Sequence, residues 1–157
     1  LVEKLRDGHA TSLGAASGIV AGLVAITPAA GALSPVGAIA LGAIAGATCA
    51  FAVGLKYKLG FDDSLDVVGV HLVGGLVGTV LIGFLATDGG LLYGGGISLL
   101  IVQILIALVA VIFSGVVTFV IASALKATMG WRIAENEEIT GIDSAEHRET
   151  AYEPIAR

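Results

Sequence analysis

Charged residues are scarce in this sequence, and their distribution is uneven. They make up 13% of the 157 residues, against about 25% in an average soluble domain. Positions 8–55 contain no Asp, Glu, Lys or Arg. The sequence also holds a single cysteine, Cys49, which excludes a disulfide framework and a cysteine-based metal site. These shortages exclude an ordinary soluble domain, and we interpret Cys49 as a small apolar residue.

Apolar residues and glycine dominate what is present. The chain is 56% hydrophobic, has a mean hydropathy of +0.96 and contains 23 glycines. Several glycines recur every fourth residue, a spacing that lets membrane helices approach closely and gain dispersion energy. They are Gly14, Gly18 and Gly22, then Gly42 and Gly46, and finally Gly74 and Gly78. The pattern predicts an all-α fold, a tightly packed bundle of transmembrane helices.

The number of spans follows from length and from breaks in helix propensity. The uncharged stretch 8–55 is too long for one span of about 20 residues. Two prolines and a glycine interrupt it between Thr27 and Pro35, so the chain is expected to turn back there. We predict a transmembrane region over 1–129 with helices at about 11–26, 36–55, 67–86 and 97–124. Thr11 or Ser12 is expected to cap the first helix.

The basic residues suggest how these helices are oriented. In a four-span arrangement one side carries Lys4, Arg6, Lys56, Lys58, Lys126 and Arg132, and the opposite loops carry no Lys or Arg. The positive-inside rule then places both ends and the loop 56–66 in the cytoplasm. Residues 130–157 hold seven acids and three bases, so we predict a cytoplasmic tail. It is either a solvated segment or a docking element.

A single histidine is the strongest functional candidate. On a regular helix Asp63, Val67, His71, Gly75 and Gly78 share one face. An ionisable side chain inside a span is costly and usually marks a functional site, which favours a transport or proton-relay role for His71. The alternative is a histidine satisfied by one hydrogen bond in a packing face. With no second histidine, cysteine or carboxylate inside the spans, a metal site is not predicted.

Three acids precede His71 and have a simpler explanation. Asp62, Asp63 and Asp66 stand where a helix begins, and acids there cap exposed amides and favour the helix dipole. Asp63 alone also belongs to a possible polar network with the histidine. Thr27 is interpreted mainly as a turn residue, or else as a hydroxyl in that same network. Because no nucleophile–base pair, phosphate-binding loop or redox motif is present, neither an enzyme nor a cofactor is predicted.

Three stretches together resemble a known family. They are 12–31 (SLGAASGIVAGLVAITPAAG), 62–71 (DDSLDVVGVH), and the tail from Gly130 through Gly141 and Asp143 to Tyr152. The sequence is similar to the ammonium transporters, the Amt/Mep/Rh family. The resemblance covers nearly the whole chain, and the middle stretch is the most specific.

The resemblance implies a larger assembly. Family members have eleven helices in two inverted halves, form homotrimers with one pore per subunit, and lie in the cell membrane. This chain corresponds to the last four helices and the cytoplasmic tail, so it is interpreted as a fragment. The first pore histidine would lie upstream of it.

The resemblance also implies roles for single residues. His71 corresponds to the second histidine of the family's pore pair, and Val67 to an apolar pore residue. Asp63, Asp66 and Thr27 match structural or polar-network positions. Gly141, Asp143 and Tyr152 match the tail that couples subunits and meets PII-type regulatory proteins.

The predicted function is passage of ammonium or ammonia through a hydrophobic pore, which serves nitrogen uptake. A dry channel rejects the ammonium charge, and an imidazole can accept and relay a proton near neutral pH. The alternative is a different proton-coupled transporter that uses an intramembrane histidine. A third possibility is a membrane module that does not transport.

Overall fold

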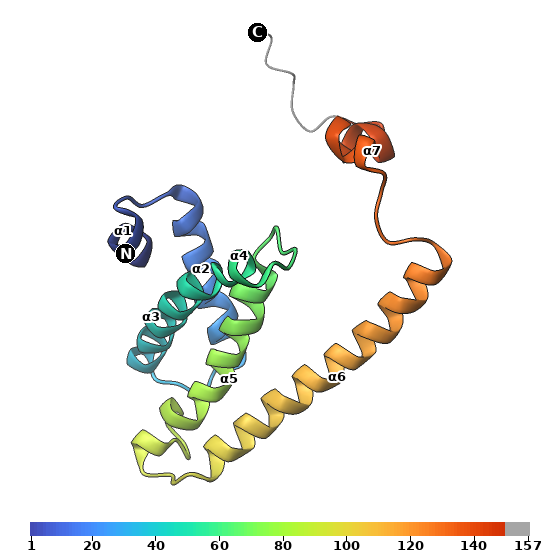
Figure 1. The fold of residues 1–157 in the computed structure, drawn as a ribbon. Coiled ribbons are helices and arrows are strands. Elements are labelled where there is room, and N and C mark those ends of the chain that lie inside the picture. The colour runs from blue at the N-terminus through green and yellow to red at the C-terminus, as the bar shows by residue number, and fades with distance from the viewer. Residues whose placement is uncertain (150–157) are drawn as a thin grey trace. The chain divides into compact units, whose positions relative to one another are not determined.

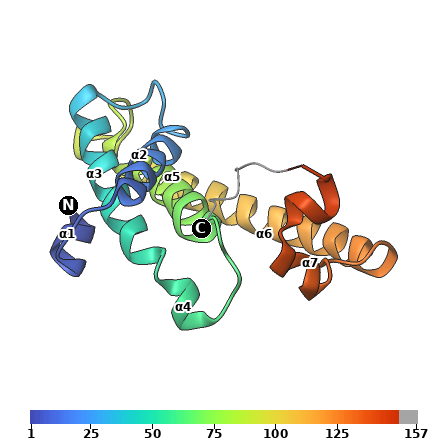
Figure 2. The same ribbon diagram turned by 90° about the horizontal axis from the view of Figure 1, so that it is seen from above.

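The computed structural model describes residues 1–149, and every regular element in that range is a helix. The chain divides into two units, Leu1–Ile112 and Phe113–Arg157. In the first unit α2 (Ser12–Ile26), α3 (Pro35–Ala52) and α5 (Val73–Leu85) pack side by side (Figures 1 and 2). The all-α prediction is confirmed.

Shorter elements connect or flank these helices. They are α1 (Val2–Asp7), α4 (Leu55–Leu59), the π-helix η1 (Val67–Leu72), the 3₁₀-helix η2 (Leu91–Tyr93), α7 (Glu135–Thr140) and the π-helix η3 (Asp143–His147). The longest helix is α6 (Ser98–Thr128), and the second unit begins within it. η1 continues directly into α5.

Within residues 1–149, three helical stretches are long and apolar enough to cross a membrane. They are Pro35–Leu59, Val67–Leu85 and Ser98–Thr128. The helix α2 is apolar but has 15 residues. Helices therefore lie where four spans are predicted, while a crossing by α2 remains a prediction.

Side-chain caps fix where two of these helices begin. The Thr11 hydroxyl accepts a hydrogen bond from the amide of Gly14 at 2.9 Å, as expected for the first helix. The Ser34 hydroxyl accepts from the amide of Gly37 at 3.1 Å, and Pro35 occupies the first turn, where its missing N–H costs nothing. The break between α2 and α3 thus follows from local sequence.

Small side chains make the core of the first unit. Ala25, Ala29, Leu41, Ala45, Ile82 and Ala86 form one buried cluster, and Ala21, Cys49 and Val70 form another. A Cβ on Gly78 would overlap the backbone of Ala25 in α2, and one on Gly74 would lie 3.3 Å from the sulfur of Cys49 in α3. The close helix approach predicted for Gly74 and Gly78 is confirmed, and Cys49 is buried as expected.

The glycines of the first two helices behave differently. A Cβ on Gly18, Gly22, Gly42 or Gly46 would meet no other atom within 4 Å. Within residues 1–149 no neighbour crowds the Cβ position of these four glycines, so a close helix approach at these positions remains a prediction. Gly14 is a special case, because its near neighbour is the Glu3 side chain.

Polar contacts tie the ends of the helices together. At one end the Glu3 carboxylate accepts from the Thr11 amide at 2.9 Å and from its hydroxyl at 2.7 Å. These two donors lower the pKa of Glu3 below its ordinary value. Arg6 donates to the carbonyl of Ala50 at 3.0 Å and lies over the ring of Phe51. Glu3 therefore joins α1 to the start of α2, and Arg6 joins it to the end of α3.

The opposite end is closed by backbone pairing between two loops. Leu33 and Ala86 form an isolated antiparallel bridge. The Thr87 amide donates to the carbonyl of Ala32 at 2.9 Å, and the Thr87 hydroxyl donates to the same oxygen at 3.2 Å. This pairing holds the loop between α2 and α3 against the end of α5.

Candidate functional site

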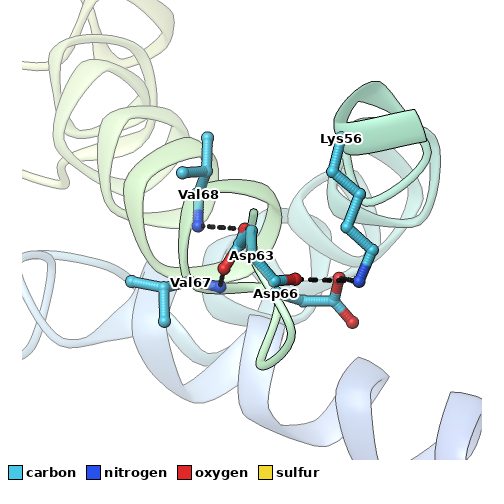
Figure 3. A network of polar contacts seen from close by, with 5 residues as sticks. All are labelled: Lys56, Asp63, Asp66, Val67 and Val68. Atoms are coloured by element: carbon cyan, nitrogen blue, oxygen red, sulfur yellow. Dashed lines mark hydrogen bonds and ion pairs between the residues drawn. The ribbon is translucent and has the colours of Figure 1, made fainter. Parts of the chain in front are cut away.

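The candidate site lies where the loop after α4 leads into η1. Figure 3 shows the Asp63 carboxylate facing the first amides of this helix. One of its oxygens accepts from the amide of Val67 at 2.7 Å and the other from the amide of Val68 at 2.9 Å. Asp63 thus satisfies two amides that the helix itself leaves unpaired, and its negative charge favours the positive end of the helix dipole.

A lysine from α4 holds the same loop. The Lys56 ammonium group donates to a carboxylate oxygen of Asp66 at 2.6 Å and to the backbone carbonyl of Asp63 at 2.9 Å (Figure 3). The side chains of Lys56 and Asp66 are 14% and 25% exposed, so this ion pair is better shielded from solvent than a surface pair. Asp66 adopts a left-handed backbone conformation with φ of 56°, which is uncommon outside glycine but tolerated by aspartate.

The helix that follows opens with a π-turn. In a π-helix the hydrogen bonds span five residues in place of four, so the side-chain pattern slips by one residue against an α-helix. Gly69 and Val70 are buried, and a Cβ on Gly69 would lie 2.8 Å from the Cα of Val53 near the end of α3. The absent side chain of Gly69 therefore allows η1 to touch the α3 backbone.

His71 and Val67 lie away from this buried side. Both are exposed, Val67 by 52%, and within residues 1–149 the His71 ring makes no hydrogen bond. The hydrogen-bonded histidine considered as an alternative is therefore not observed within this range. The site presents an imidazole and an apolar side chain on the open side of a helix whose other side is packed.

The single face predicted for the five residues from Asp63 to Gly78 is wrong at both ends. Asp63 lies outside the helix and caps it. Gly78 belongs to the buried side, where it contacts Ala25. The physical reason is the π-turn together with the loop that precedes it, since neither follows the α-helical period.

Thr27 does not join this network. Its hydroxyl donates to the carbonyl of Leu23 at 2.7 Å, and it follows the last residue of α2. Val70 of η1 packs instead with Ala21 in α2 and Cys49 in α3. The structure thus brings Asp63, Asp66 and Val67 together and leaves Thr27 as a helix-terminating residue. Within residues 1–149 its hydroxyl makes no contact with the histidine, and its assignment to a polar network remains a prediction.

The tail residues lie in the second unit. Gly141 ends α7 with φ of 108°, and its amide donates to the carbonyl of Glu137. Asp143 begins η3, and Tyr152 lies outside the described residues. Upstream of α7, Arg132 forms a two-point contact with the carboxylate of Glu138 at 2.8 and 3.1 Å.

Two residues of the site were missed from the sequence. In the sequence, Lys56 contributes only to the charge pattern that predicts membrane orientation. Gly69 lies outside the four-residue glycine spacing. Lys56 stands ten residues before Asp66, across a loop whose path no local pattern predicts. Within the described part of the chain, no group of three or more His, Cys, Asp and Glu side chains is placed to hold a metal ion.

Comparison with known proteins places the chain in a family. The Ammonium Transporter Family pattern matches residues 1–152. An ammonium transporter of Mycobacterium tuberculosis (strain H37Rv) is 55% identical over 98% of this chain and 35% of its own length. One from Aquifex aeolicus is 47% identical over 96% of the chain and 36% of its own length, and Amt1 of Archaeoglobus fulgidus is 40% identical over 92% and 38%.

The chain therefore spans little more than a third of the length of the curated relatives it matches. The matches nonetheless cover nearly all of the chain itself, including the helices around the candidate site. Together with the long apolar helices, they identify part of a multi-pass membrane protein that is not an enzyme. This chain belongs to the ammonium transporter family.

Proposed function

We propose that this chain forms the C-terminal part of an ammonium transporter and supplies one wall of its ammonia pathway. The observation that carries the proposal is the position of His71 and Val67 on the open side of η1, opposite the buried Gly69 and Val70. Family membership makes ammonium the natural substrate class.

Physical chemistry favours a polar or hydrated neighbour for His71. An imidazole inside a membrane span is costly unless it faces a protein interior or a wet cavity. Since its ring has no hydrogen bond within residues 1–149, its partner lies elsewhere in the assembly or is the transported molecule. An imidazole nitrogen can accept a proton and return it, which suits a relay.

The mechanism separates the proton of ammonium from neutral ammonia. An apolar passage strongly disfavours an uncompensated charge, so ammonium gives up its proton before ammonia crosses the narrow part. His71 accepts or relays that proton, and Val67 supplies an apolar wall. Hydrated sodium and potassium ions cannot shed charge in this way and are excluded.

The wider assembly follows from the family resemblance. The transporter has eleven helices in two inverted halves, a first pore histidine in the other part of the polypeptide, and three subunits in the cell membrane. All four apolar helices cross the bilayer, including α2, and both ends lie in the cytoplasm. The tail, with Gly141, Asp143 and Tyr152, meets neighbouring subunits and a PII-type regulatory protein, and transport serves nitrogen uptake.

The test is uptake of labelled methylammonium by the complete polypeptide that contains this sequence. It is expressed in cells lacking their own ammonium carriers, and wild type is compared with His71→Leu. His9→Leu is the matched control, because His9 is exposed and hydrogen-bonds only locally, to the Asp7 carbonyl at 3.0 Å. Immunoblots of membrane fractions correct for the amount of each variant.

Saturable uptake that ammonium blocks, that His71→Leu abolishes or alters and that His9→Leu leaves intact supports the proposal. Absence of wild-type uptake despite correct insertion overturns it and favours another proton-coupled transporter. Uptake that is indifferent to His71→Leu keeps the transport function but removes the histidine from the pathway.

A further inference from the structure

Lys56 contacts the segment that leads into η1 at two points. Its ammonium group bridges the carboxylate of Asp66 and the backbone carbonyl of Asp63. Asp63 in turn binds the amides of Val67 and Val68 through both carboxylate oxygens. Lys56 thus reaches the first amides of η1, the helix that carries His71, through a single intervening residue, Asp63.

A second attachment lies three residues before Lys56. Gly69 packs against Val53, with a space too small for a Cβ. Val53 and Lys56 both belong to the continuous apolar stretch Pro35–Leu59. One van der Waals contact and one ionic contact therefore join η1 and the loop before it to the same segment. Val70 of η1 also packs with Ala21 and Cys49, and its carbonyl accepts from the Cys49 thiol at 3.8 Å.

The backbone of Asp66 has a left-handed conformation, which is unfavourable for most residues other than glycine. A left-handed conformation outside glycine persists when surrounding contacts hold it. The Lys56 contact supplies such a hold, because it binds the Asp66 side chain and the carbonyl three residues earlier. Without it, the Asp66 backbone is free to relax, and its carbonyl accepts a hydrogen bond from the Val70 amide of η1 at 2.8 Å.

We propose that Lys56 is a positioning residue that holds the π-turn of η1 and thereby orients His71 toward the transport pathway. The inference rests on the proposed transport function for its effect on uptake, but its effect on the turn does not. Lys56 touches neither His71 nor substrate. It acts through Asp66, Asp63 and the amides of η1.

The experiment compares three variants of the complete polypeptide in lipid nanodiscs and in cells. Lys56→Met keeps the length of the side chain but removes its donors, and Lys56→Arg keeps donors and charge. Lys58→Met is the matched control. Lys58 is an exposed residue of α4, two positions after Lys56, and its substitution removes the same positive charge. Hydrogen–deuterium exchange is followed in peptides covering 67–72 and 12–26, and methylammonium uptake is measured over a range of concentrations.

We expect Lys56→Met to speed exchange over 67–72 and to leave 12–26 unchanged. Maximal uptake should fall by about tenfold. This is less than the roughly hundredfold loss that a misplacement of about 1 Å can cause, because Lys56 acts on His71 only through other residues. The half-saturating concentration should stay within about twofold, as expected when a step after binding is affected. Lys56→Arg should restore most of both properties, and Lys58→Met should match wild type.

Exchange in Lys56→Met that equals exchange in Lys58→Met overturns the proposal. Faster exchange with unchanged uptake also overturns it, since the turn would then be held without consequence for His71. No uptake by wild type together with the expected exchange pattern overturns the proposed function and leaves Lys56 as the residue that holds the turn. If Lys56→Met fails to insert, Asp66→Asn, which keeps an oxygen acceptor, should show the same changes to a smaller degree.

Discussion

Glycines in two regions of this chain look alike in sequence and differ in structure. In η1 and α5, Gly69 and Gly78 lie against the backbones of α3 and α2, with no room for a Cβ. In α2 and α3, Gly22 and Gly42 face open space among residues 1–149. Both regions contain several glycines, yet only those of η1 and α5 lie against a neighbouring backbone within residues 1–149.

The difference shows what a small-residue pattern can and cannot predict. Such a pattern identifies a helix surface that another helix can approach closely, because lipid gives no hydrophobic drive and dispersion contacts must hold helices together. It does not identify the neighbour. For η1 and α5 the neighbours are α2 and α3, whereas no atom of residues 1–149 crowds the Cβ positions of Gly22 and Gly42.

The largest effect on stability is expected for Gly78→Ala. The added Cβ would overlap the backbone of Ala25. Because a helix backbone is less able to move aside than the end of a flexible side chain, we expect a loss of about 3 kcal/mol or more in the free energy of unfolding. Denaturant titration of the purified chain in detergent measures it. Gly75→Ala is the control, because a Cβ there meets nothing within 4 Å. Equal stabilities for the two variants would refute the assigned packing.

A smaller effect is expected at Gly14, where the near neighbour is a flexible side chain. Gly14→Ala should displace the Glu3 carboxylate from Thr11 and reduce stability less than Gly78→Ala does. Glu3→Gln should lose part of the same contact without changing Gly14. Thermal unfolding of both variants and wild type provides the ranking.

The contact between Glu3 and Thr11 also predicts how the stability of the chain changes with pH. Donation by Thr11 lowers the pKa of Glu3 in the folded chain below the ordinary value of 4.5. The stabilising contribution is therefore complete above pH 4.5 and is lost as the pH falls through the lowered folded-state pKa. The stability difference between wild type and Glu3→Gln should shrink on acidification over that range. A difference that grows instead would contradict the assignment.

The smallest effect should come from Gly42→Ala. Nothing lies within 4 Å of the added Cβ, and replacing glycine in a helix gains up to about 1 kcal/mol from reduced backbone freedom. Denaturant titration should show equal or slightly higher stability for the isolated chain. A clear loss would mean that a neighbour among residues 1–149 packs on this face after all, and the contrast with Gly78 would fail.

Local signals in the sequence indicated the start of the first long helix and the break between α2 and α3. Thr11 caps α2, as expected of a hydroxyl residue that precedes an apolar run, and the segment with Pro28 and Pro35 forms the connection between α2 and α3. These outcomes depend on side chains within a few residues of one another. They need no knowledge of tertiary structure.

The arrangement around His71 could be predicted only in part. The acids before the helix indicated capping, and Asp63 does cap it. No local pattern indicated the π-turn, and the contacts of Gly69 with Val53 and of Asp66 with Lys56 join residues at least ten positions apart. The α-helical period therefore assigned Gly78 to the wrong side. The roles of His71, Val67, Asp66 and the tail residues remain predictions.

The unequal lengths of α2 and α6 bear on how the protein is made. With 31 residues, α6 extends about 46 Å and has no charge before Lys126, so it exceeds a bilayer core of about 30 Å. By contrast, the 15 residues of α2 extend about 22 Å. We expect the translocon to release α6 into lipid by itself, whereas α2 requires α3 to be synthesised before it settles. Biogenesis would then proceed by inserting α2 and α3 as a hairpin.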